Sequence, residues 1–178
     1  MIKKVGVIGS GQMGNGIAHV AALAGLDVVL NDLSAERLKS AMATINGNLS
    51  RQVAKKIISE DARKQALTRI VSSGTMDGLA DCDLVIESAV EKEEVKRKIF
   101  HDLCAVLKPD AIVASNTSSI SITRLAASTD RPERFIGIHF MNPVPLMELV
   151  ELIRGIATDD ATFEAAKEFV TRLGKLGR

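Results

Sequence analysis

Short apolar runs alternate with amphipathic segments along this chain. The runs are bounded by glycine, proline or polar residues, as is typical of buried strands. We expect strands over 3–9, 27–32, 82–89, 111–118, 134–141 and 146–153. We expect helices over 12–24, 93–107 and 160–173, the last capped by Thr158 or Asp159. Strands that alternate with helices predict an α/β fold, a doubly wound, mostly parallel sheet (a Rossmann fold) covered on both faces.

A longer helical segment follows the second strand. Ser34 is placed to cap a helix whose apolar stripe runs from Leu38 to Ile57 at intervals of three or four residues. A second helix, over about 60–70, follows a capping signal at Ser59. A crossover between parallel strands needs less chain than this. We therefore expect the pair, at about 35–70, to project from the sheet.

Length, composition and charge restrict the class of protein. The 178 residues suit a single domain, 1–178, and 46% hydrophobic residues suit a globule with a proper core. The net charge of +1 gives no electrostatic argument for a nucleic acid or a membrane as partner. The start, MIKKVGVIG, resembles neither a signal peptide nor a transit peptide, and the two cysteines have no metal-ligand spacing. We expect a soluble, cytoplasmic protein without a metal.

The stretch VGVIGSGQMGNGIAH (5–19) places glycines between a strand and a helix. Gly9 suits a sharp turn, Gly11 a close approach of a pyrophosphate to the backbone, and Gly14 close packing of helix on strand. The amides at the helix start would face the pyrophosphate charge. Gln12 and Met13, between the second and third glycines, are counted with the cofactor-binding residues. A glycine-rich turn without a ligand is the alternative.

Asp32 follows at the end of the second strand, 18 residues past Gly14. Its carboxylate is expected to accept hydrogen bonds from the adenosine ribose and to repel the extra phosphate of NADP, which favours NAD. Arg37 is interpreted as a solvated charge, although it would partly offset that repulsion. The chain has no tyrosine, which excludes the short-chain dehydrogenases with their Tyr-x-x-x-Lys pair. A flavoprotein or a methyltransferase remains open at this point.

One of the three histidines stands where a ligand is expected. His139 closes the strand FIGIH, and ligands of doubly wound sheets bind at the carboxyl ends of the strands. A histidine there suits a general base for an alcohol. Its partner is Glu148 or Glu151, which the alternation of MELVELI places on opposite faces without choosing between them. His19 and His101 are interpreted as a packed and a surface residue.

The segment SNTSSIS (115–121) follows another strand. One interpretation is a turn that caps the next helix. The other places Ser118 or Ser119 against a substrate oxygen. The two interpretations are compatible.

Four stretches together resemble the NAD-binding domain of the 3-hydroxyacyl-CoA dehydrogenases, most closely the bacterial 3-hydroxybutyryl-CoA type. They are GVIGSGQMGNGIAHVAALAG, VIESAVEKEEVK, ASNTSSISI and GIHFMNPVPLMELVELI. The resemblance runs from residue 2 to about 174. It implies interconversion of 3-hydroxyacyl-CoA and 3-ketoacyl-CoA with NAD, in fatty acid or butanoate metabolism.

The resemblance also implies roles for individual residues. The catalytic histidine falls on His139, its partner on Glu151, and a serine that contacts cofactor and substrate on Ser118. NAD contacts are added at Glu91, Lys96 and Asn142. For CoA, Lys55 on the helical projection matches a lysine of the family, and Asn48 stands where the family has a serine.

The family pattern continues beyond residue 178 into a helical C-terminal domain that makes the homodimer contact. We expect this chain to lack that domain and the strand that follows the last helix. A site with one wall missing is expected to bind NAD with weak or absent turnover, and the exposed apolar face to favour self-association. A non-catalytic NAD-binding module is the alternative function. The acyl-chain preference is not readable from these residues.

Overall fold

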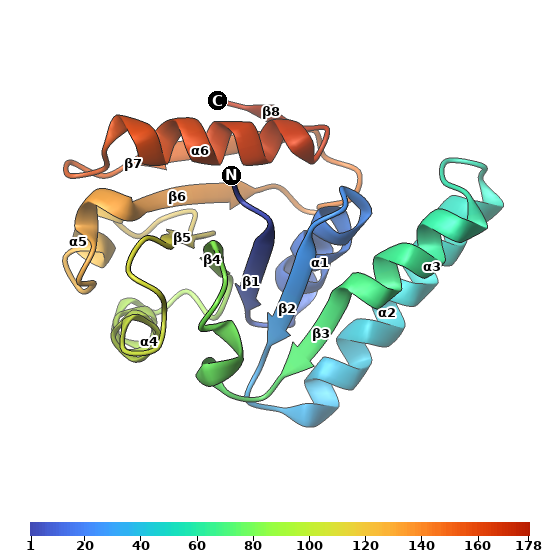
Figure 1. Cartoon of the computed structure of the whole chain (residues 1–178), viewed down its shortest axis with the longest axis horizontal. Coiled ribbons are helices and arrows are strands. Elements are labelled where there is room, and N and C mark those ends of the chain that lie inside the picture. Colours follow the sequence, from blue (N-terminus) through green and yellow to red (C-terminus); the bar gives the residue numbers. More distant parts are fainter.

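The computed structural model describes residues 1–178 and arranges eight strands in one sheet (Figure 1). The strands are β1 (Lys4–Ile8), β2 (Asp27–Asn31), β3 (Ile70–Ser73), β4 (Leu84–Glu87), β5 (Ile112–Ser115), β6 (Phe135–Phe140), β7 (Leu149–Arg154) and β8 (Leu176–Gly177). Their order is β3-β2-β1-β4-β5-β6-β7-β8, and only the β6–β7 pair is antiparallel. The prediction of a doubly wound, mostly parallel α/β fold is confirmed.

Helices cover both faces of this sheet. They are α1 (Gln12–Leu23), α2 (Ala35–Ala54), α3 (Glu60–Arg69), α4 (Glu93–Cys104), α5 (Ile122–Ala126) and α6 (Asp160–Arg172), with short 3-10 turns η1 (Met76–Leu79) and η2 (Pro132–Arg134). The larger apolar core packs α1, α2 and α6 against one face, and a smaller core packs α4 and α5 against the other. Asp159, one of the two predicted caps, accepts the Thr162 amide at the start of α6.

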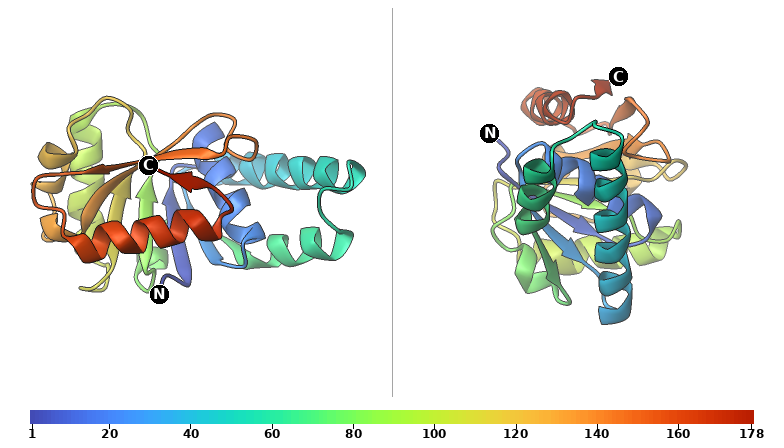
Figure 2. Two further views of the ribbon diagram at one scale, coloured as in Figure 1. Left: turned by 90° about the horizontal axis from the view of Figure 1, so that it is seen from above. Right: turned by 90° about the vertical axis from the view of Figure 1, so that its right-hand side faces the viewer.

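The helices α2 and α3 extend well beyond the edge of the sheet, as Figure 2 shows from above. Each begins at the serine that the sequence predicts: Ser34 accepts the amide of Arg37, and Ser59 accepts the amide of Ala62. Ile45 and Leu49 are fully buried on the inner face of α2. The apolar stripe ends earlier than predicted, because α2 stops at Ala54 and Ile57 is exposed.

Two predictions about strands near the end of the chain are wrong. Strand β7 begins at Leu149, so Glu148 precedes it instead of lying on it. The strand expected to be missing after the last helix is present in short form as β8, whose Leu176 amide donates to the Glu148 carbonyl. Next to it, the buried Lys175 ammonium donates to the carbonyls of Val144 (2.7 Å) and Met147 (2.5 Å). The last residues thus hold the loop between β6 and β7.

Strand β3 was not predicted at all. It is the edge strand of the sheet, and two of its four residues, Val71 and Ser72, are exposed. A strand this short with so little buried surface leaves neither an apolar run nor an alternation in the sequence.

Candidate active site

The glycine turn between β1 and α1 has an open backbone surface. Gly9 has a φ of +95°, a conformation that favours glycine, and a Cβ on Gly14 would lie 1.7 Å from the Gly9 carbonyl oxygen. A Cβ on Gly11 would meet nothing closer than the Arg37 guanidinium, at 3.7 Å. Gly14 is therefore required by packing within the protein. Nothing in the protein itself requires Gly11 to lack a side chain.

The helix that follows this turn begins without a side-chain cap. Gly11 is its N-cap residue, and its first turn contains no acidic side chain. A cavity of about 500 Å³ lies beside this turn, between it and the start of α2. Backbone amides at an uncapped helix start attract an anion through their partial positive charge. These residues fit the pyrophosphate of a dinucleotide.

Asp32 lies beside the same turn and is only 8% exposed. Its Oδ2 accepts the amide (3.0 Å) and the hydroxyl (2.8 Å) of Ser10, and its Oδ1 accepts the amide of Ser34 (3.1 Å). Burial raises the pKa of Asp32, but these hydrogen bonds and the guanidinium of Arg37, 3.5 Å from Oδ2, bring it below its usual value. Asp32 is an anion at neutral pH. Arg37, interpreted from the sequence as a solvated charge, is also its ion-pair partner.

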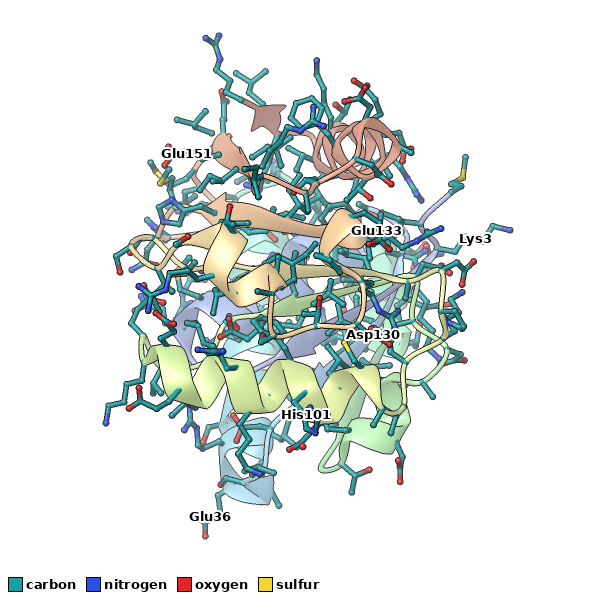
Figure 3. All side chains as sticks on the ribbon, turned by 90° about the vertical axis from the view of Figure 1, so that its left-hand side faces the viewer. Lys3, Glu36, His101, Asp130, Glu133 and Glu151 are labelled. Carbon is teal, nitrogen blue, oxygen red and sulfur yellow. The ribbon has the colours of Figure 1, made fainter.

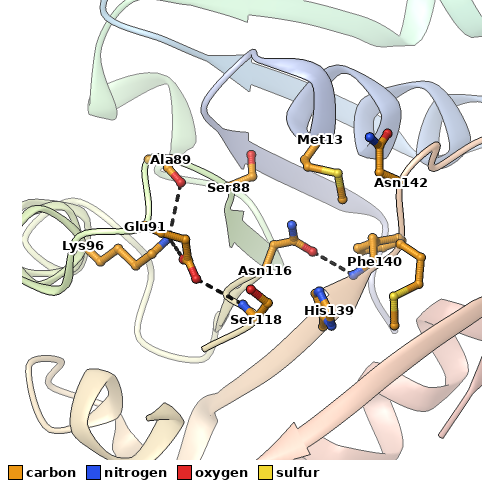
Figure 4. A pocket seen from close by; sticks show the side chains of 11 residues that line it. Met13, Ser88, Ala89, Glu91, Lys96, Asn116, Ser118, His139, Phe140 and Asn142 are labelled. Atoms are coloured by element: carbon orange, nitrogen blue, oxygen red, sulfur yellow. Dashed lines mark hydrogen bonds and ion pairs between the residues drawn. The ribbon is translucent and has the colours of Figure 1, made fainter. Parts of the chain in front are cut away.

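A second cavity, of about 290 Å³, lies where strands β4, β5 and β6 end (Figure 4). It is lined by Met13, Ser88, Ala89, Glu91, Lys96, Asn116, Ser118, His139, Phe140, Met141 and Asn142. Six of these residues are site residues proposed from the sequence: Met13, Glu91, Lys96, Ser118, His139 and Asn142. Met13 comes from α1, so the cavity lies next to the glycine turn.

His139 and Glu151 stand directly opposite each other on the antiparallel strands β6 and β7. The Nδ1 atom of His139 is 3.0 Å from Oε1 of Glu151. The His139 side chain is 20% exposed and that of Glu151 is 49% exposed. A carboxylate bound at Nδ1 favours the tautomer that carries the proton there, which leaves Nε2 as the basic nitrogen. This arrangement suits a general base and its partner. Of the two glutamates left open by the alternation, Glu151 makes the contact.

Glu91 joins the loop after β4 to the SNTSS loop after β5. Its Oε2 accepts the hydroxyls of Thr117 (2.8 Å) and Ser119 (3.0 Å) and the amide of Ser118 (3.3 Å). Burial raises the pKa of Glu91, but these hydrogen bonds and the nearby Lys96 bring it below its usual value. Of the two candidate serines, Ser119 is engaged with Glu91, whereas Ser118 lines the cavity. The segment also caps α5, through Ser121.

Lys96 is buried beneath this loop, with 1% of its side chain exposed. Its ammonium lies 2.6 Å from Oε2 of Glu87 and 3.2 Å from Oε1 of Glu91. The other oxygen of Glu87 accepts the hydroxyl of Ser115, 2.7 Å away. A buried ion pair is tolerated when the remaining polar atoms are satisfied, as they are here. Lys96 therefore borders the cavity while it is held by two carboxylates.

Four other residues considered from the sequence lie away from this cavity. Asn48 and Lys55 are on the projecting α2, where the Asn48 Oδ1 accepts the Arg51 guanidinium at 2.6 Å and Lys55 is exposed at the end of the helix. His19 is buried and contacts Gln52. His101 lies on the outer face of α4, far from Glu151 (Figure 3).

The sequence does not single out two polar residues of the cavity. Ser88 follows β4, and its hydroxyl donates to the Ile8 carbonyl. Asn116 follows β5, and its Oδ1 accepts the Phe140 amide at 2.7 Å. The signal available for Asn116 was its place in the SNTSS segment, where an asparagine also suits a turn.

The fold and the glycine turn define a dinucleotide-binding domain of the dehydrogenase type. The family model "3-hydroxyacyl-CoA dehydrogenase, NAD binding domain" matches residues 4–177. The chain belongs to this family, as the resemblance implied, and NAD is the cofactor of the domain. No helix combines the length and the apolar character that crossing a bilayer requires.

Comparison with individual proteins is more specific than the match to the family model. The 3-hydroxybutyryl-CoA dehydrogenase of Bradyrhizobium diazoefficiens is 83% identical over 175 residues, which are 98% of this chain and 60% of that protein. The crystal structure of (S)-3-hydroxybutyryl-CoA dehydrogenase PaaH1 from Ralstonia eutropha superposes with a TM-score of 0.97 at 46% identity, covering 99% of this chain and 62% of that one. The crystal structure of Mycobacterium tuberculosis FadB2 superposes with a TM-score of 0.96 at 43% identity, and the match covers 99% of this chain and 62% of that one. The chain thus spans about three fifths of the length of these relatives.

Proposed function

We propose that this chain is the NAD-binding part of a 3-hydroxybutyryl-CoA dehydrogenase, which interconverts 3-hydroxybutyryl-CoA and acetoacetyl-CoA. The observation that carries the proposal is the His139–Glu151 pair at 3.0 Å, with His139 lining a cavity next to the glycine turn. A dinucleotide-binding domain alone does not require a histidine held by a carboxylate at that place. The oxidation of an alcohol does, because its proton needs an acceptor.

His139, Glu151 and Ser118 then each have a chemical task. NAD, when bound, accepts the hydride from C3 of the substrate. His139 takes the proton of the 3-hydroxyl at Nε2, and Glu151 orients the ring and offsets its positive charge. The hydroxyl of Ser118 holds the reacting oxygen.

The proposed cofactor contacts run from Asp32, past the glycine turn, to the cavity at the ends of β4, β5 and β6. Gly9, Gly11, Gln12, Met13 and Gly14 form the turn against the pyrophosphate, and the Asp32 carboxylate takes the adenosine ribose. Glu91, Lys96, Ser118 and Asn142 border the nicotinamide end.

The acyl-CoA partner is assigned to the projecting helices. Lys55 is exposed at the end of α2 and offers a positive charge to a phosphate, and Asn48 lies two turns before it with an amide nitrogen free to donate. We propose 1–178 as one NAD-binding domain, and a homodimer formed through a C-terminal helical domain for the longer, cytoplasmic protein. Leu149 and Leu176, paired on β7 and β8, are exposed, and so are Leu146 and Met147 in the loop before β7; we propose that together they form an apolar face. Such a face suits contact with further protein.

The test follows NADH emission as the chain is titrated in, and then adds acetoacetyl-CoA. The chain has no tryptophan or tyrosine, so the emission reports on the cofactor alone. We expect an emission change on binding, followed by weak or absent oxidation of NADH, because Glu151 is half-exposed and Ser118 is exposed to water in this chain. No emission change would refute the proposal.

A non-catalytic NAD module is the second candidate, favoured by the same exposure of Ser118 and Glu151. The two candidates differ when the chain is combined with the rest of a longer relative. A dehydrogenase domain gains turnover there that depends on His139, and a binding module gains none.

A further inference from the structure

Asn116 is a polar residue of the cavity to which neither the sequence nor the proposed mechanism gives a task. It follows β5 directly, and its backbone amide donates to the Glu87 carbonyl at 2.9 Å. Its side chain is half-buried between the ends of β4 and β6. Both the backbone and the side chain are therefore fixed to the neighbouring strand ends.

The orientation of the Asn116 amide is set by its partner. The group 2.7 Å from its side chain is the backbone N–H of Phe140, which only donates. The oxygen of the amide must therefore face Phe140, and the nitrogen must face the other way. In Figure 4 that nitrogen points into the cavity, toward the side formed by Met13 and Ser88 and away from His139. It has no hydrogen-bond partner within the protein.

We propose that the Asn116 side-chain nitrogen donates to the carboxamide oxygen of the nicotinamide half of NAD, an oxygen that can only accept. The inference rests on the proposed function. The direction of the nitrogen favours the cofactor over the substrate, because Met13 belongs to the helix start that borders the pyrophosphate, whereas proton transfer takes place at His139. A donor with a fixed orientation binds an oxygen without the cost of ordering a mobile side chain.

This assignment gives Asn116 two separable tasks. Its oxygen holds the Phe140 amide and thus the end of the strand that carries His139. Its nitrogen contacts the cofactor. Asn116→Asp keeps an acceptor of the same shape for Phe140 and removes both N–H donors.

The test compares the binding of NADH and of ADP to wild type and to Asn116→Asp. NADH contains the nicotinamide half and ADP does not. We expect NADH to bind about tenfold or more weakly to the variant, as the loss of a donor to a buried acceptor predicts. The affinity for ADP should stay within about twofold, because the adenosine half lies at Asp32.

The control is Asn46→Asp on α2. There, too, the side-chain oxygen accepts an N–H, from Arg63 at 2.7 Å, and the residue is exposed outside the cavity. This variant should bind both ligands like wild type. If thermal unfolding shows that Asn116→Asp is not folded, Asn116→Ser, with a shorter hydroxyl acceptor, takes its place with the same expectation.

The outcomes separate the two proposals. Unchanged NADH affinity in the folded variant would overturn the role of Asn116 while wild-type binding still supports the proposed function. An equal loss for NADH and ADP would also overturn it, since the effect would not be specific to the nicotinamide half. If wild type binds ADP but not NADH, the proposed function is refuted, and the proposed role of Asn116 is refuted with it.

Discussion

Gly11 offers a direct test of whether the glycine turn is shaped for a ligand or for the protein itself. The perturbation is Gly11→Ala. The new Cβ would lie 3.7 Å from the Arg37 guanidinium, an ordinary contact, and the backbone φ of −67° suits alanine. Within the protein the change is therefore sterically harmless. If a pyrophosphate lies against this backbone, the same methyl group occupies its place.

The expected magnitudes differ widely between stability and binding. Alanine is a poorer N-cap residue than glycine, which costs about 1 kcal/mol of unfolding free energy. Displacing an anion from two backbone amides removes charge-assisted hydrogen bonds worth about 1.5 kcal/mol each. The sum of about 3 kcal/mol corresponds to roughly a hundredfold loss of affinity. Gly11→Ala should thus fold nearly as well as wild type and bind NADH about a hundredfold more weakly.

The assay combines NADH emission titrations with urea unfolding followed by circular dichroism. Gly47→Ala is the matched control, because a Cβ on Gly47, inside α2, would meet nothing closer than 4.0 Å. It should stabilise α2 by about 0.5–1 kcal/mol and leave NADH binding unchanged. Gly14→Ala should fail to fold normally, because its Cβ would lie 1.7 Å from the Gly9 carbonyl oxygen. A stable Gly11→Ala protein with wild-type NADH affinity would refute the reasoning.

Four further predictions concern single side chains. His139→Gln should abolish any acetoacetyl-CoA-dependent oxidation of NADH and leave the NADH affinity nearly intact, whereas a loss of affinity would indicate a structural role. Glu151→Gln should slow the same reaction about a hundredfold or more. Because the folded-state pKa of Asp32 lies below its usual value of 3.8, its contribution to stability is present above that pH and is lost as the pH falls further. Urea titrations at descending pH should show a smaller acid-induced loss of unfolding free energy for Asp32→Asn than for wild type. Lys175→Met should lower the unfolding free energy by about 1–3 kcal/mol, because two carbonyls lose their donor. Lys167 is exposed, so Lys167→Met serves as the control. Equal losses of unfolding free energy in the two variants would contradict the prediction.

Much of the fold could be predicted from the sequence, because most of its elements depend on patterns within a few neighbouring residues. The glycine turn, the capping serines Ser34 and Ser59 and the buried central strands each leave a signal within a few residues. Strand β8 left no such signal, because two residues pair with β7 only once α6 has returned the chain to the sheet edge.

Less of the site could be predicted from the sequence, because its geometry depends on contacts between residues that are far apart in the sequence. Alternation in the sequence predicts Glu148 and Glu151 on opposite faces, whereas in the structure Glu148 precedes β7 and the register of β6 and β7 sets Glu151 opposite His139. Asn116 carries no recognisable chemistry in the sequence. Its significance comes from the Phe140 amide, 24 residues away, which fixes its orientation.

The antiparallel β6–β7 ladder has a consequence for how such a protein can diversify. His139 and Glu151 are aligned by the pairing of their strands, which runs from Ile136–Arg154 to Phe140–Val150. The connecting loop, 141–148, contributes Met141 and Asn142 to the cavity. Insertions or substitutions in the loop would therefore alter which ligand the cavity admits while the proposed proton-transfer pair, His139 and Glu151, stays in register. An evolving lineage, or a protein engineer, can change selectivity there without rebuilding the chemistry.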